Sequence, residues 1–195
     1  MMFLRRAVLV MTVVVIGAAA PAQAGGSAGQ WVSDLGTRVV KVLESTGDQP
    51  EQRKDALEQI FVESFDVEFV AKFVVGRFWR KASAEERAEF MTVLPDYVAT
   101  VYAALFAGYE GDGFKVTKES NSNNGTYIQG LILQSDGPDV EAAFTISKPS
   151  GDYLIKDASV EGISLLVTKR SEFGSVLARE GMDGLIARMR KVLRS

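Results

Sequence analysis

The stretch Val-Glu-Ala-Ala-Phe-Thr-Ile-Ser, residues 140–147, decides the class of fold that this sequence encodes. Its larger apolar positions recur at every second residue, at Val140, Phe144 and Ile146, with the small Ala142 between them. A repeat of two is typical of a strand with one buried and one solvated face. Proline and glycine mark short turns on both sides, at residues 137–138 and 149–151. We therefore expect a strand of an antiparallel sheet here.

The segments around this strand show similar patterns between turn residues. Further strands are expected at residues 114–120, 126–135, 153–160 and 163–168. Asn123-Asn124-Gly125 is a typical hairpin turn between the first two of them. Because such short turns join antiparallel neighbours, the sequence predicts a twisted antiparallel sheet of about four to five strands.

Helical periodicity replaces the strand pattern on both sides of the predicted sheet. Apolar residues repeat at intervals of three and four in segments 31–45, 51–64, 67–75, 84–107, 171–179 and 183–193. Asp66 can cap the third segment, and Ser83 with Glu86 forms a capping box before the fourth. The order of helices, strands and helices predicts one α+β domain, with helices packed on the sheet.

The first 24 residues predict where the protein works. Arg5 and Arg6 precede an apolar run at residues 7–20, and a small-x-small site ends at Ala24. This arrangement is typical of a cleavable secretory signal peptide. The run is shorter than the roughly 20 apolar residues of a bilayer span, although an uncleaved anchor is the alternative. We expect residues 25–195 to form the mature domain, free in an envelope compartment.

The composition excludes several classes of function. The chain has no His and no Cys, which removes Ser-His-Asp and Cys-His catalysis, disulfides and the usual zinc ligands. Its formal net charge is −3, and it has no basic run, so nucleic-acid binding is not expected. An enzyme would have to use carboxylates such as Asp157 and Glu161, which are four residues apart. No metal site or catalytic residue is predicted.

The predicted strand at 126–135 is apolar on both faces. Tyr127, Leu131 and Leu133 share one face, whereas Ile128 and Ile132 share the other. A half-buried strand normally has one polar face. Such an excess of apolar side chains fits either a filled core or the wall of a ligand cavity, and the pattern does not decide between them.

A set of short motifs points to a family. The sequence contains Val160-Glu161-Gly162-Ile163-Ser164-Leu165, then Thr168-Lys169, Glu172-Phe173-Gly174 and Gly181-Met182-Asp183-Gly184-Leu185. Upstream stand Phe65-Asp66, Gly76-Arg77-Phe78-Trp79-Arg80, Glu86-Arg87 with Phe90, and Val101-Tyr102-Ala103. In this order the motifs resemble the MlaC or toluene-tolerance family of periplasmic phospholipid-binding proteins. The resemblance covers roughly residues 65–185.

The resemblance implies a carrier that holds phospholipid as cargo and needs no cofactor. It implies two partners, an inner-membrane ABC transporter complex with an MlaD-like subunit and an outer-membrane MlaA-like lipoprotein. It also implies an apolar cavity between helices and sheet, in a protein that we expect to be a monomer. Tyr153 and Leu94 depart from the family pattern, and the hopanoid-associated HpnM branch remains an alternative. A protein-binding module with a filled core is another.

The inward faces of the predicted helices and strands supply a hypothetical lining for this cavity. The expected lipid-binding residues are Phe69, Phe73, Val98, Tyr102, Leu105, Ile128, Ile132, Phe144, Ile146, Val160, Ile163 and Leu165.

Overall fold

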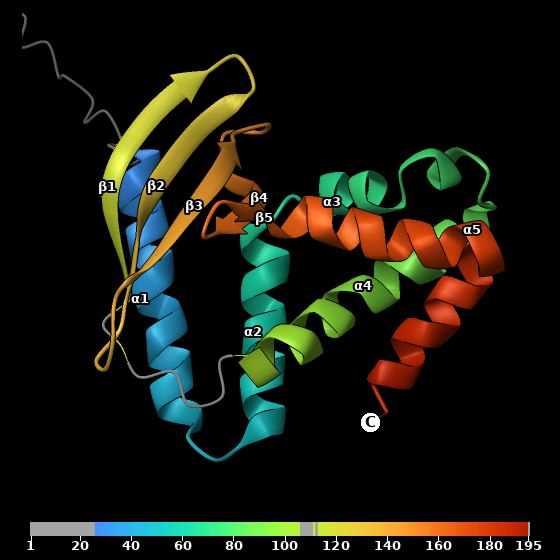
Figure 1. Cartoon of the computed structure of the whole chain (residues 1–195), viewed down its shortest axis with the longest axis horizontal. Helices are drawn as coiled ribbons and strands as arrows, with labels where there is room; N and C mark the ends of the chain where they lie inside the picture. Colours follow the sequence, from blue (N-terminus) through green and yellow to red (C-terminus); the bar gives the residue numbers. More distant parts are fainter. Residues whose placement is uncertain (1–25, 106–110, 112, 195) are drawn as a thin grey trace, which may run out of the picture.

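The computed structural model describes residues 26–105, 111 and 113–194 and shows an α+β fold (Figure 1). Helices come first: α1 (Ala28–Thr46), α2 (Pro50–Ser64), α3 (Val67–Val75), the 3-10 helix η1 (Gly76–Arg80) and α4 (Ala84–Leu105). The strands are β1 (Gly113–Ser122), β2 (Gly125–Leu133), β3 (Val140–Ser147), β4 (Leu154–Val160) and β5 (Ile163–Ser164). The long α5 (Leu165–Val192) closes the chain. The predicted fold class is confirmed.

The sheet is an antiparallel meander in the order β1-β2-β3-β4-β5. Helix α1 packs against β1 and β2, and α2 lies beside α1. Helices α3, α4 and α5 form a second group that extends away from the sheet, while α4 reaches back to pack on α2 (Figure 1). The molecule therefore has a sheet side and a helical side, which meet along β4 and α2.

A glycine in β2 allows an aromatic ring to cross the inner face of the sheet. Gly130 pairs with Val116 on one side and with Ala142 on the other. A Cβ at Gly130 would lie 2.4 Å from Cζ of Phe114 and 2.2 Å from the carbonyl oxygen of Lys115. The absence of a side chain is therefore required for the packing of Phe114, which stands edge-on to Phe144 at 5.1 Å between ring centroids.

The predicted helix caps are present. The Asp66 side chain accepts a hydrogen bond from the Phe69 amide at 3.0 Å. Ser83 and Glu86 form the reciprocal pair of a capping box, with distances of 3.1 and 2.6 Å. These caps set where α3 and α4 begin.

The predicted strand at 163–168 is wrong beyond its first two residues. β5 ends at Ser164, and α5 begins at Leu165, because the Ser164 hydroxyl caps the helix by accepting the Val167 amide at 3.0 Å. The apolar run at 165–167 has no period of its own, so it does not separate strand from helix. The two predicted C-terminal helices join at Gly181, whose positive φ of 71° produces a kink.

Within the described part of the chain, the buried apolar residues fall into three groups rather than one continuous core. The largest joins α3, α4 and α5, and includes Phe90 and Phe173. A second lies between α1 and the sheet, around Ile128 and Ile155. The smallest joins α1 to α2 near Leu57. The space that these groups leave between them is the candidate site.

Substituting Gly130 by Ala should destabilise the fold by about 1–3 kcal/mol, because the new methyl group overlaps Phe114 and the Lys115 carbonyl. Urea denaturation would measure this change. Gly174→Ala is the matched control, since nothing lies within 4 Å of its added methyl group in α5. It should leave stability unchanged or raise it by about 0.5–1 kcal/mol. Equal stability of wild type and G130A would contradict this packing of Phe114 across Gly130.

Candidate functional site

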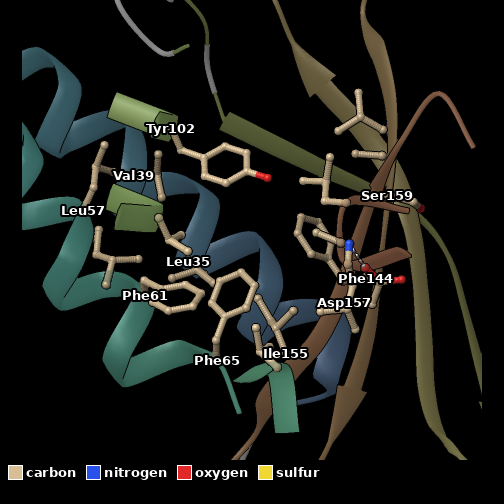
Figure 2. A pocket seen from close by; sticks show the side chains of 18 of the residues that line it. Leu35, Val39, Leu57, Phe61, Phe65, Tyr102, Phe144, Ile155, Asp157 and Ser159 are labelled. Atoms are coloured by element: carbon tan, nitrogen blue, oxygen red, sulfur yellow. Dashed lines mark hydrogen bonds between the residues drawn. The ribbon is translucent and has the colours of Figure 1, made fainter. Parts of the chain in front are cut away.

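A cavity of about 290 Å³ lies between the sheet and the two groups of helices (Figure 2). Leu35 and Val39 of α1, Leu57 and Phe61 of α2, and Phe144 of β3 converge on it. Several of their neighbours, such as Val32, Leu94 and Ile155, are buried from outside solvent, so apolar surface lines an internal space. Native interiors are normally close-packed, and an opening of this size is typical of a binding site.

Six helices and strands form the apolar walls of the cavity. Among the described lining residues, those from α1, α2, α3, β1, β2 and β3 are all apolar or glycine. They are Val32, Leu35, Gly36, Val39, Val40, Leu57, Ile60, Phe61, Val70, Val74, Gly113, Phe114, Ile132, Ala142 and Phe144. Phe65, between α2 and α3, adds its ring to the same wall (Figure 2). These walls can hold hydrocarbon but offer no side-chain partner for a polar group.

The polar lining residues gather on the other three elements, α4, β4 and α5. They are Tyr97, Tyr102, Lys156, Asp157, Ser159 and Lys169. Tyr102 reaches from α4 with its hydroxyl directed toward the strands, where Asp157 and Ser159 lie (Figure 2). These polar residues thus lie on one side of the cavity, its polar side, although nearly all of the surface that lines the cavity is apolar.

Asp157 has a structural role, because both of its carboxylate oxygens accept hydrogen bonds from within the protein. It accepts hydrogen bonds from the Ser164 hydroxyl at 2.7 Å and from the Leu166 amide at 3.2 Å, and so holds the first turn of α5. Glu161 lies in the exposed turn after β4, with a φ of 51°. The two carboxylates therefore do not face each other as an acid-base pair.

Lys169 brings a positive charge to the polar side. Its side chain is 23% exposed, and its Nζ lies 2.7 Å from a carboxylate oxygen of Glu172. Burial by itself lowers the pKa of Lys169, but the hydrogen bond to Glu172 and the nearby tyrosines leave it above its ordinary value. The ammonium group consequently stays charged at neutral pH.

Tyr102 remains a hydrogen-bond donor under the same conditions. Burial raises the pKa of its hydroxyl, and the opposing effect of the Lys169 charge is smaller. Its phenol O–H is the polar end of an otherwise apolar side chain inside the cavity. Across the described residues, no group of three or more carboxylate, His or Cys side chains is arranged to hold a metal ion.

The structure brings six of the twelve predicted lining residues to the cavity. These are Val98, Tyr102, Ile132, Phe144, Val160 and Leu165. The side chain of Leu105 lies outside the described part of the chain. The remaining five are Phe69, Phe73, Ile128, Ile146 and Ile163, and all five lie elsewhere.

Each of these five has a local reason for its position. Ile128 and Ile146 are on the inner face of the sheet, as predicted, but the start of α1 covers them and leaves them at most 1% exposed. Phe69 and Phe73 lie under cations, Lys156 and Arg170. Ile163 is 63% exposed in β5.

The prediction missed the contribution of α1 and of the α2–α3 junction. Leu35 and Val39 line the cavity and lie four residues apart, a spacing that the sequence does display. Phe61 and Phe65, also four apart, stack at 4.8 Å between ring centroids. Of the two departures from the family pattern, Leu94 lines the cavity, whereas Tyr153 packs against Trp31.

Comparison with known protein families identifies the family of this chain. The family model described as MlaC protein matches residues 33–191. The chain belongs to the MlaC family. The match includes most of α1, the other helices before the sheet, the sheet and nearly all of α5, so every described lining residue of the cavity except Val32 lies within it.

Two individual proteins show how far the likeness extends. The intermembrane phospholipid transport system binding protein MlaC of Haemophilus influenzae is 25% identical over 131 residues, which are 65% of this chain. The chain spans about three-fifths, 61%, of that curated relative. A solved structure of a phospholipid-binding protein from Ralstonia solanacearum, in complex with a phospholipid, has a TM-score of 0.69 at 16% identity. The match covers 84% of this chain and 97% of that one, so the two share a fold.

Filling part of the cavity should reduce its capacity for apolar ligands. Val98→Trp places an indole in the cavity wall, and we expect binding of the fluorescent probe N-phenyl-1-naphthylamine to fall several-fold. Val62→Trp adds the same group on the outer face of α2, where Val62 is 50% exposed, and should leave probe binding unchanged. Undiminished binding by a folded V98W would place the probe outside this cavity.

Proposed function

We propose that the protein is a periplasmic carrier that binds phospholipid with its acyl chains in the cavity. The observation that supports this most strongly is the almost wholly apolar lining of a cavity of about 290 Å³ between the sheet and the helices. Such a lining suits the hydrocarbon tails of a lipid. Family membership agrees with the proposal, as do the phospholipid transport and phospholipid binding of the two similar proteins.

The energetics of such a carrier require no chemical step. Burying one CH₂ group contributes about 0.8 kcal/mol, so a 16-carbon chain represents roughly 12 kcal/mol. A lipid that leaves a bilayer loses this stabilisation and must regain it in the protein. The apolar walls can supply that burial, and uptake and release are then nearly balanced. Contacts along methylene groups have little directionality, so the chains themselves should be recognised loosely.

The proposed location follows from the N-terminal sequence. Residues 1–24 are proposed to direct export and to be removed before Gly25. None of the described helices is both long and apolar enough to span a bilayer. We further propose that the carrier, as a monomer, moves lipid between an outer-membrane MlaA-like lipoprotein and an inner-membrane ABC transporter complex with an MlaD-like subunit.

The lipid content of the protein tests the proposed cargo. We expect the protein purified from the periplasm to copurify with glycerophospholipid, detected by native mass spectrometry and by lipid extraction. The V98W variant should contain several-fold less of it, and V62W should match wild type. A hopanoid in the extract would indicate an HpnM-like carrier. A wild-type protein without lipid, or with equal lipid in V98W, would contradict the proposal.

Leader removal is testable by intact mass. Expression of the full sequence in a Gram-negative host should yield a periplasmic protein that begins at Gly25. Replacing Ala22 and Ala24 by Leu should block cleavage, because the peptidase requires small residues at these two positions. A wild-type protein that retains residues 1–24 and stays in the membrane fraction would show an anchor instead.

A further inference from the structure

Two apolar side chains are exposed to water where α5 begins. Ile163 in β5 is 63% exposed, and Val167 in the first turn of α5 is 55% exposed. In the part of the chain that the structure describes, they are the two most exposed large apolar residues, and they lie four positions apart. Apolar side chains are costly to expose to water, and neighbouring ones mark contact surfaces. The residues around this pair therefore indicate what the surface contacts.

Cations and aromatic rings from α3, β4 and α5 adjoin the exposed pair. Arg170 is one turn along α5 from Val167, and its guanidinium lies 4.8 Å from the ring centroid of Phe73. Phe73 and Phe69 are neighbours on α3, with 5.9 Å between their ring centroids. The ammonium of Lys156 in β4 lies 4.9 Å from the Phe69 ring centroid. We call this surface the α3–α5 patch, and its members are Phe69, Phe73, Lys156, Ile163, Val167 and Arg170.

The α3–α5 patch lies beside the cavity and outside it. Apart from Lys156, none of its members is among the described lining residues. At the start of α5, Leu166 and Lys169 line the cavity, whereas Val167 and Arg170 are exposed. Helix α3 lies along this part of α5, so the two helices present one continuous surface (Figure 1). The patch is therefore a second surface, separate from the site described above.

The α3–α5 patch is positively charged, in contrast to the chain as a whole. Lys156 and Arg170 form no ion pair with any carboxylate of the described residues. The sequence has a formal net charge of −3. A local excess of cations on an acidic protein favours contact with an anionic surface. The exposed Glu161, in the turn before Ile163, opposes this local charge.

An anionic bilayer complements both the apolar and the basic members of the patch. Aliphatic side chains such as Ile163 and Val167 enter the hydrocarbon region without a matching pocket, while basic groups stay at the headgroup level. Each cation near an anionic lipid surface adds to the attraction. Protein interfaces rely more on Tyr, Trp and direct hydrogen bonds, and the exposed pair offers none of these. The composition of the patch therefore favours a lipid surface over a protein partner.

We propose that the α3–α5 patch docks the protein directly on bilayers that contain anionic phospholipid, with Ile163 and Val167 inserted among the lipids. This contact brings the cavity to the lipid surface, because Lys156 belongs to both the patch and the cavity lining. It goes beyond the proposed function, in which lipid is exchanged with protein complexes, and it does not require a lipid in the cavity.

Co-sedimentation with vesicles tests this docking. The mature protein is mixed with vesicles of equal amounts of dioleoylphosphatidylglycerol and dioleoylphosphatidylcholine, or with vesicles of dioleoylphosphatidylcholine alone. We expect wild type to bind the anionic vesicles more tightly and to lose most of this preference at high salt, because ions screen the attraction. Equal binding to both kinds of vesicle would overturn the proposal that the cations of the patch recognise an anionic surface.

The variant Val167→Glu separates docking from folding. It places a negative charge in the patch and should weaken binding to the anionic vesicles about tenfold or more. Val167 is three residues after the cap Ser164, a position that favours Glu, so the stability of α5 should be kept. Val62→Glu makes the same change on α2 at a 50% exposed position and should bind as wild type does. Glu161→Gln removes the opposing charge and should strengthen binding.

Three other outcomes would overturn docking through the α3–α5 patch. The first is equal binding of anionic vesicles by wild type and V167E. The second is loss of vesicle binding in a folded V98W, because this variant alters the cavity and would place the lipid contact there. The third is a wild type that copurifies with lipid and binds neither kind of vesicle. That result would leave the carrier function standing and would assign the patch to an acidic protein surface.

Discussion

The position of both groups of helices depends on hydrogen bonds to a single strand, β4. The Ile155 carbonyl accepts the Asp66 amide at 2.9 Å, and this fixes the junction between α2 and α3. Two residues further on, Asp157 accepts the Ser164 hydroxyl and the Leu166 amide, and this fixes the start of α5. The register with β3 shifts between these two points. β4 therefore sets the separation of the two groups, and with it the width of the cavity.

The cavity is a consequence of how these anchored elements pack. Helix α1 covers one part of the sheet, and α4 rests on α2, where Lys54 and Asp96 form an ion pair at 3.0 Å. The space between the three buried groups stays open because each helix already has a partner elsewhere. Its apolar walls are costly to expose to water. Occupation by hydrocarbon would remove this cost, and a rigid frame would let cargo enter and leave without refolding the walls.

Patterns confined to one element were readable from the sequence, and contacts between elements were not. The alternation at 140–147 and the capping box at Ser83 depend on neighbouring residues, so they predicted β3 and the start of α4 correctly. The apolar run after Ser164 lacked a period, and the bond from Asp157 that decides it is tertiary. The inner faces of β2 and β3 were also predicted correctly, but which part of them α1 covers depends on packing. Ile128 consequently lies in the core, whereas Ile132 faces the cavity.

If the protein is the proposed carrier, hydrocarbon occupies the space in front of β3. The most direct measurement places the photoreactive p-benzoylphenylalanine at Phe144, which lines the cavity, and at Tyr127, which is 40% exposed on β2 and does not. After irradiation of protein loaded with phospholipid, mass spectrometry should find lipid covalently attached at position 144 and none at position 127. Equal capture at both positions, or capture at 127 alone, would contradict binding of the acyl chains in this cavity.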